Sequence, residues 1–92
     1  MTIFAVLLPS PQPKLVEEIK KSYAENSLQI TDTQWIVSDT GTAVDVCRKL
    51  KIYPEQPPSG SAIVFSTSSY FGRAPSTIWD WIKVKLEAAP NA

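Results

Sequence analysis

The polar residues between positions 66 and 77 are the part of the chain best suited to binding an anion. Serine hydroxyls follow an apolar run, and Arg73 precedes a segment with a helical pattern. A helix N-terminus attracts anions through its unpaired N–H groups and its dipole, and hydroxyls with an arginine could complete a phosphate or carboxylate site. The residues of this predicted anion site are Ser66, Ser68, Ser69, Arg73, Ser76 and Thr77. The alternative interpretation is a turn followed by a helix cap, because serine and threonine favour both.

Several other chemistries are excluded by residue type. The chain has no histidine and one cysteine, Cys47, whereas structural zinc sites use four cysteine or histidine ligands. Nucleophilic sites of the Ser-His-Asp or Cys-His kind also need a histidine. The aspartates are scattered, and no two of them suggest an acid–base pair or a magnesium site. The sequence therefore predicts no catalytic residue, no metal and no cofactor.

Composition restricts the partners and the location. Nine basic and nine acidic residues cancel, so the chain lacks the charge of a general nucleic-acid binder, and nucleic acid is not an expected partner. Its apolar runs are shorter than a membrane span. The opening "MTIFAVLLPSP" has no basic segment of the signal-peptide kind, and a lone cysteine is typical of the cytoplasm. We therefore expect one cytoplasmic domain over residues 1–92, with a frayed tail at 89–92.

Hydrophobic periodicity predicts the secondary-structure elements. Continuous apolar residues predict strands, and apolar residues three or four apart predict helices. Thr42 with Asp45 has the form of a capping box at the start of the second helix. The predicted elements are a strand at Ile3–Leu8, a helix at Lys14–Glu25, two short strands at Leu28–Ile30 and Gln34–Ser38, a helix from Thr42 to Leu50, a strand at Ala62–Phe65 and a helix from Pro75 to about Ala88.

The order of these elements leaves two folds open. If the two short strands form a hairpin, the order is βαββαβ with an added C-terminal helix, which is an α+β, ferredoxin-like sandwich with an antiparallel sheet. If only one of them is a strand, the order is βαβαβα, a minimal three-stranded parallel α/β sheet with helices on both faces. We favour the hairpin because Asp32, between the two short strands, favours a turn.

Part of the chain resembles a known family. The segment "TQWIVSDTGTAVDVCRKL" (Thr33 to Leu50), with the strand and helix before it and the apolar strand after it, is similar to the SinR-like relatives of the CRISPR adaptation endoribonucleases. The resemblance is carried by Trp35 in a strand and by Thr42-Ala43 at a helix start, and it implies a ferredoxin-like fold. Nucleases of that family place an aspartate after the first strand to hold a metal. This chain has "LLPSPQP" there, which argues against nuclease activity, and the resemblance leaves a nucleic-acid-related role as a third alternative.

The last predicted helix is more apolar than a surface helix needs to be. At 100° per residue, Ile78, Trp79, Ile82 and Leu86 occupy an arc of roughly 100°, and Trp81 and Val84 widen it to about 220°, although a surface helix needs only about 100°. Either the helix packs inside its own fold, or it meets a partner, because tryptophan is enriched at interfaces. The second alternative predicts a homo-oligomer or a protein partner. Its predicted interface comprises Tyr70, Phe71, Trp81, Val84 and Lys85.

Overall fold

The computed structural model describes residues 1–54, 56–68 and 72–87, which form one α+β unit. The predicted order of elements, with two consecutive strands between the first two helices, is confirmed. The elements are β1 (Thr2–Leu7), α1 (Pro13–Ser22), β2 (Ser27–Thr31), β3 (Gln34–Asp39), α2 (Ala43–Lys49), β4 (Ile63–Ser66) and α3 (Ser76–Glu87).

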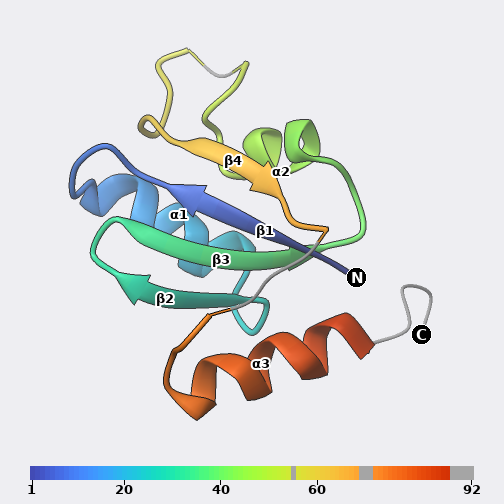
Figure 1. The fold of residues 1–92 in the computed structure, drawn as a ribbon. Coiled ribbons are helices and arrows are strands. Elements are labelled where there is room, and N and C mark those ends of the chain that lie inside the picture. The colour runs from blue at the N-terminus through green and yellow to red at the C-terminus, as the bar shows by residue number, and fades with distance from the viewer. Residues whose placement is uncertain (55, 69–71, 88–92) are drawn as a thin grey trace.

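The four strands form one antiparallel sheet in the order β2-β3-β1-β4 (Figure 1). β1 lies at its centre, antiparallel both to β3 and to β4. β2 pairs antiparallel with β3, as the predicted hairpin requires. The alternative of a three-stranded parallel sheet is therefore wrong. The turn around Asp32 reverses the chain after β2, so β3 returns beside it.

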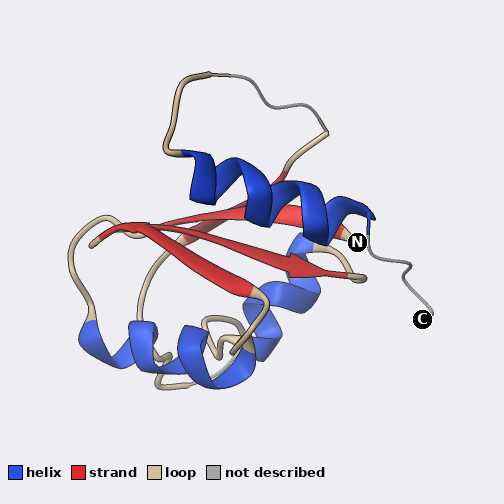
Figure 2. Cartoon of the chain, turned by 90° about the horizontal axis from the view of Figure 1, so that it is seen from below, coloured by secondary structure: helices blue, strands red, loops and turns tan. Residues whose placement is uncertain are grey.

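Helices lie on both faces of the sheet, with α1 and α2 on one face and α3 on the other (Figure 2). The alternation of side chains along β1 explains how both faces are covered, because successive residues of a strand point to opposite faces. Phe4 and Val6 are buried with Leu15 of α1 and Val46 of α2. Ile3, on the other face, is buried with residues of α3. From Ile3 to Val6 the strand is apolar on both faces, because each face meets a helix there.

Helix α3 packs against the second face through the middle of its apolar arc. Ile82 is 8% exposed and clusters with Ile3 of β1 and Ile36 of β3. Trp79 and Trp81 flank Ile82 around the helix axis, and both are partly buried against the same cluster. A helix lying on a sheet contacts it over a wide arc, and this contact accounts for Trp81, one of the two residues that widen the apolar arc of this helix.

Helix α1 ends earlier than predicted, at Ser22 instead of Glu25. Tyr23, the next residue, has left helical geometry and is buried, and its hydroxyl donates a hydrogen bond of 2.6 Å to Asp39 of β3. The chain then turns, with the Asn26 N–H donating to the Tyr23 carbonyl. The tyrosine therefore links the end of α1 to the end of β3.

Helix α2 begins with the predicted capping box. The Thr42 hydroxyl accepts from the Asp45 N–H at 3.3 Å, and the Asp45 carboxylate accepts from the Thr42 N–H at 2.8 Å. Two N–H groups that the helix cannot satisfy internally are thus bonded. The cap also fixes the direction in which the chain leaves β3.

Replacing the cap should weaken the whole domain, because Val46 and Leu50 of this helical segment are fully buried. We expect Thr42→Ala to lower the free energy of unfolding by about 1 kcal/mol, the usual cost of losing a threonine cap. Thr40→Ala is the matched control, because Thr40 is exposed just before the cap. Urea unfolding of both variants checks this, and equal stabilities would show that the cap contributes nothing.

Candidate interaction surface

Three large apolar side chains lie exposed side by side on the face of the sheet that carries α3. Leu7 of β1 is 40% exposed, and Ile63 and Phe65 of β4 are 61% and 51% exposed. Leu7 pairs directly with Ile63, and Phe65 pairs with the neighbouring Ala5. We call Leu7, Ile63 and Phe65 the open strip. Scattered apolar residues are normal on protein surfaces, whereas contiguous ones indicate an interaction site.

The open strip is exposed because α3 does not extend across the sheet. Val64 packs into the core under α1 and α2, so its neighbours Ile63 and Phe65 point to the opposite face. On that face α3 lies toward β2, and among the described residues no helix covers β4 (Figure 1). One helix covers only part of a four-stranded sheet, and the part left uncovered is apolar.

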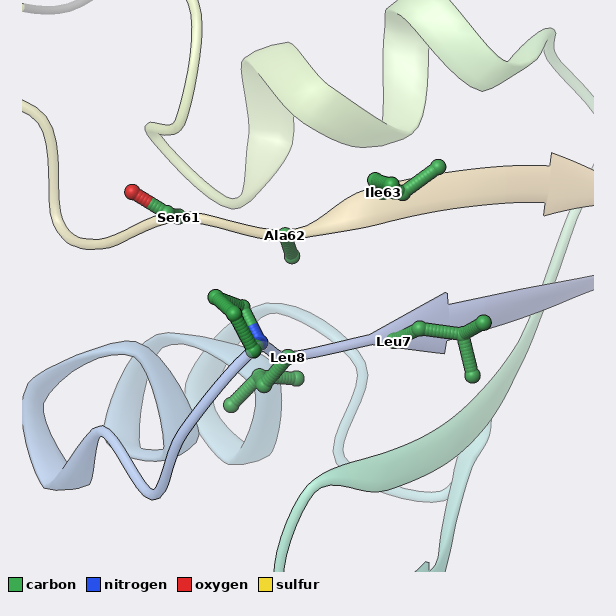
Figure 3. Close-up of a pocket in the computed structure, with 6 residues that line it drawn as sticks. Leu7, Leu8, Ser61, Ala62 and Ile63 are labelled. Atoms are coloured by element: carbon green, nitrogen blue, oxygen red, sulfur yellow. The ribbon is translucent and has the colours of Figure 1, made fainter.

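A shallow apolar pocket continues the open strip where β1 ends and β4 begins. Its volume is about 260 Å³, and its walls are almost wholly carbon. Figure 3 shows Leu7 and Ile63 on the neighbouring strands, with Leu8, Ser61 and Ala62 beside them at the strand ends. Pro9 completes the lining. A pocket of this kind could receive an apolar side chain, and it offers nothing to an ion.

The wall of the pocket is held in place by the side chain of Gln12, just before α1. Its amide nitrogen donates to the Ser61 carbonyl at 2.8 Å, and its amide oxygen accepts from the Ser61 N–H at 2.7 Å. The preceding Gly60 lies so close that an added Cβ would be 2.6 Å from the Gln12 oxygen. These contacts position the start of β4 against the end of β1.

A buried carboxylate on the other side of the sheet belongs to the framework. Asp39 is 4% exposed. One of its oxygens accepts from the Tyr23 hydroxyl at 2.6 Å and from Lys49 at 2.8 Å, and the other accepts from the Gly41 N–H at 2.9 Å. Burial alone would raise the pKa of this carboxyl, but the bonds from Lys49, Tyr23 and Gly41 outweigh it and lower the pKa.

The partners of Asp39 leave this cluster with no group suited to acid–base work. Burial, together with the hydrogen bond to Asp39 and its negative charge, raises the pKa of Tyr23. The phenol therefore stays protonated and donates a hydrogen bond to the carboxylate. The side chain of Lys49 on α2 is half exposed, and its ammonium lies 5.9 Å from the centre of the Tyr23 ring. The cluster joins α1, β3 and α2.

A second, smaller pocket of about 180 Å³ lies beside α2 and is lined by Ala43, Val44, Cys47 and Tyr53. Burial raises the pKa of the Cys47 thiol, which disfavours the reactive thiolate. Among the described residues, no three acidic or cysteine side chains gather where a metal ion could bind.

The described residues of the predicted anion site fall into two groups, one at the end of β4 and one at the start of α3. Ser66 ends β4 and Ser68 follows it, and both are exposed. Ser76 and Thr77 open α3 on the β2 side of the sheet, across its width from β4 (Figure 1). Arg73 is exposed before α3, and Ser69 lies outside the described residues. In place of the flanking serines, Thr67 is the residue tied to the sheet, its hydroxyl donating to the Ile3 carbonyl at 2.8 Å.

The residues of the predicted helix interface have different surroundings. Trp81 lies partly buried against the protomer's own sheet, with the Lys85 ammonium 5.8 Å from the centre of its ring. Val84 is 63% exposed, since it lies roughly 160° around the helix from Ile82. Tyr70 and Phe71 lie outside the described residues. Among the described residues of this set, Val84 presents the most exposed apolar side chain.

Sequence reasoning missed the open strip because the apolar run in β4 reads as a buried strand. Because Ile63, Val64 and Phe65 are all apolar, their sequence gives no sign that one face of the strand is covered and the other exposed. The number of elements could have indicated it. With two helices on one face, a single helix remains to cover the second face of a four-stranded sheet, and part of that face must stay exposed. No comparable signal marked Asp39 as the partner of Tyr23.

Comparisons with known proteins assign no family. No protein-family model matches the chain, and no curated protein matches it in sequence. In the part of the chain that the structure describes, every helix is too short or too polar to cross a membrane.

Proposed function

We propose that this chain is a small non-catalytic interaction domain whose working surface is the open strip with its adjoining pocket. The observation that carries the proposal is the contiguous exposure of Leu7, Ile63 and Phe65 beside a helix that leaves them uncovered. Large apolar side chains held together on a rigid sheet favour association, because covering them removes their surface from water.

Several features support an interaction role. The surface is apolar and the chain carries no net charge, so a protein surface is a better match than a nucleic acid. The pocket beside the strip has the apolar lining that an interface anchor residue needs. The free thiol of Cys47 agrees with a reducing compartment such as the cytoplasm.

The fold we propose is ferredoxin-like with α3 added. The antiparallel sheet order β2-β3-β1-β4, with α1 and α2 together on one face, supports it. We keep the similarity to SinR-like proteins as a proposal, and we use it to support the ferredoxin-like fold and not an activity. The end of β1, where nucleases of the resembled family carry a metal-holding aspartate, has Leu8 and Pro9 here, and both line the apolar pocket.

Site-specific photocrosslinking in cells tests the function. Benzoylphenylalanine is placed at Phe65, in the open strip, or at Lys20, an exposed position on α1 on the opposite side of the sheet. Both variants use the whole chain, and both sites tolerate a bulky exposed side chain. We expect a discrete covalent adduct from position 65 that position 20 does not give.

The mass of the adduct identifies the class of partner. An adduct of twice the mass of the chain indicates a second copy, and any other discrete mass indicates a different protein. If position 65 gives no adduct, or gives the same adducts as position 20, the open strip is not an interaction surface and the proposal fails.

A further inference from the structure

The outer edge of β4 carries backbone groups that point away from the sheet. The Thr67 N–H donates to the Ile3 carbonyl at 2.9 Å, so these two residues form a hydrogen-bonded pair. Bonded and non-bonded pairs alternate along antiparallel strands. Phe65 therefore directs its N–H and carbonyl toward β1, whereas Val64 and Ser66 direct theirs outward. Among the described residues no strand lies beyond this edge.

The two edges of the sheet differ in how they are protected. Proteins guard exposed edges with very short strands, bulges, charges, prolines or a covering helix or loop. The β2 edge has an irregular register between Gln29 and Thr31, and both of these residues are polar and exposed. The β4 edge, with the sequence Ile-Val-Phe-Ser, has an unbroken register and no charge or proline. The β4 edge is short, but among the described residues it is the edge without a bulge, a charge or a proline, so it is the more open to pairing with another strand.

We propose that the partner at this edge is a second copy of the chain, paired β4 to β4 in antiparallel orientation, an inference that rests on the proposed function. A two-fold axis passes beside Val64. Val64 then exchanges hydrogen bonds with Val64 of the second copy, and Ser66 exchanges them with Ala62 of the second copy. The two sheets become one continuous sheet, closed by the symmetry of the pair.

The side chains of β4 suit this arrangement. Residues directly opposite each other in antiparallel strands share a face, so the axis at Val64 sets Ile63 opposite Phe65 of the second copy. The contact is an aromatic side chain against a β-branched one, which is a favourable cross-strand pair. It occurs twice, and it joins the two open strips into a single apolar surface.

Charge and size also favour a second copy. The segment from Ser61 to Ser68 contains no charged residue, and the chain has no net charge, so two copies meet there without repulsion. The short strand offers less than the roughly 800 Å² per partner of a standard interface. The dimer should therefore be weak and reversible.

Proline substitutions on the two edges test the pairing. Ser66→Pro removes an outward N–H from β4 without removing a bond to β1, and proline is tolerated at such edge positions. Gln29→Pro is the matched control, because the bond from the Ser38 N–H to the Asn26 carbonyl makes the Gln29 N–H point outward from β2. We expect sedimentation equilibrium to show at least tenfold weaker dimerisation for Ser66→Pro and no change for Gln29→Pro.

A second variant keeps the test open if Ser66→Pro fails to fold by circular dichroism. Ile63→Lys changes an exposed side chain and sets like charges close to the two-fold axis, so it should also weaken the dimer at least tenfold. A wild-type chain that is monomeric at about 1 mM, or a dimer that the folded β4-edge variants leave intact, overturns the inference. If position 65 then still crosslinks to another protein, the interaction function stands and only the second copy is wrong.

Discussion

Asp39→Ala should be among the most destabilising single substitutions at a polar side chain in this protein, lowering the free energy of unfolding by about 3 kcal/mol. The carboxylate receives hydrogen bonds from Tyr23, Lys49 and Gly41. Without it the buried Tyr23 hydroxyl loses its hydrogen-bond acceptor, and the end of α1 loses its attachment to β3. Urea denaturation at pH 7 measures the loss.

The stabilisation should disappear in acid. The folded state lowers the pKa of Asp39 below its usual value, so its contribution to stability is complete above the unfolded pKa of about 3.9 and is lost as the pH falls through the folded pKa. The difference in stability between wild type and Asp39→Asn should therefore stay constant from pH 7 to about pH 4 and shrink as the pH falls further.

Asp80→Ala is the matched control for the pH 7 measurement, because Asp80 is exposed on α3. We expect its effect to lie within about 0.5 kcal/mol of zero, the usual range for surface substitutions. If Asp39→Ala is no more destabilising than Asp80→Ala, the bonds from Tyr23 and Lys49 do not hold the framework together.

Ile82→Asp should detach α3 from the sheet. Ile82 is 8% exposed and contacts Ile3 and Ile36, and the substitution removes an apolar contact and places a charge against an apolar face. We expect a loss of about 3 kcal/mol in the free energy of unfolding. Tryptophan fluorescence should shift to the red, because Trp79 and Trp81 lose their packing.

Val84→Asp is the control on the same helix. Val84 is 63% exposed, so the substitution should leave the fluorescence and the stability of the domain nearly unchanged. Equal effects of Ile82→Asp and Val84→Asp would mean that α3 does not rest on the sheet through Ile82. The open strip would then be part of a larger uncovered face.

Local patterns predicted most of the elements, and tertiary contacts account for the errors. The turn at Asp32 and the capping box at Thr42 were found because their signals lie within a few residues. The end of α1 was missed because Tyr23 bonds to Asp39, 16 residues away. The strand predicted at Ala62–Phe65 is displaced by one residue, to Ile63–Ser66.

The candidate surface was harder to predict, because exposure depends on the position of α3. The apolar arc of the last helix left two alternatives open, packing within the fold or contact with a partner, and the sequence does not say which surface the helix covers. Trp81 packs against the sheet of its own chain. The large apolar side chains left uncovered on the sheet include Ile63 and Phe65 of β4. No local sequence pattern shows that α3 leaves β4 uncovered.

Amide hydrogen exchange at β4, followed by NMR at two protein concentrations, tests the β4 pairing most directly. Val64 and Ser66 direct their N–H groups outward, so these amides should exchange rapidly in dilute solution and at least several-fold more slowly near 1 mM. Phe65 directs its N–H toward β1 in both states, so its exchange should change less. Exchange at Val64 and Ser66 that is independent of concentration would contradict pairing between two copies at this edge.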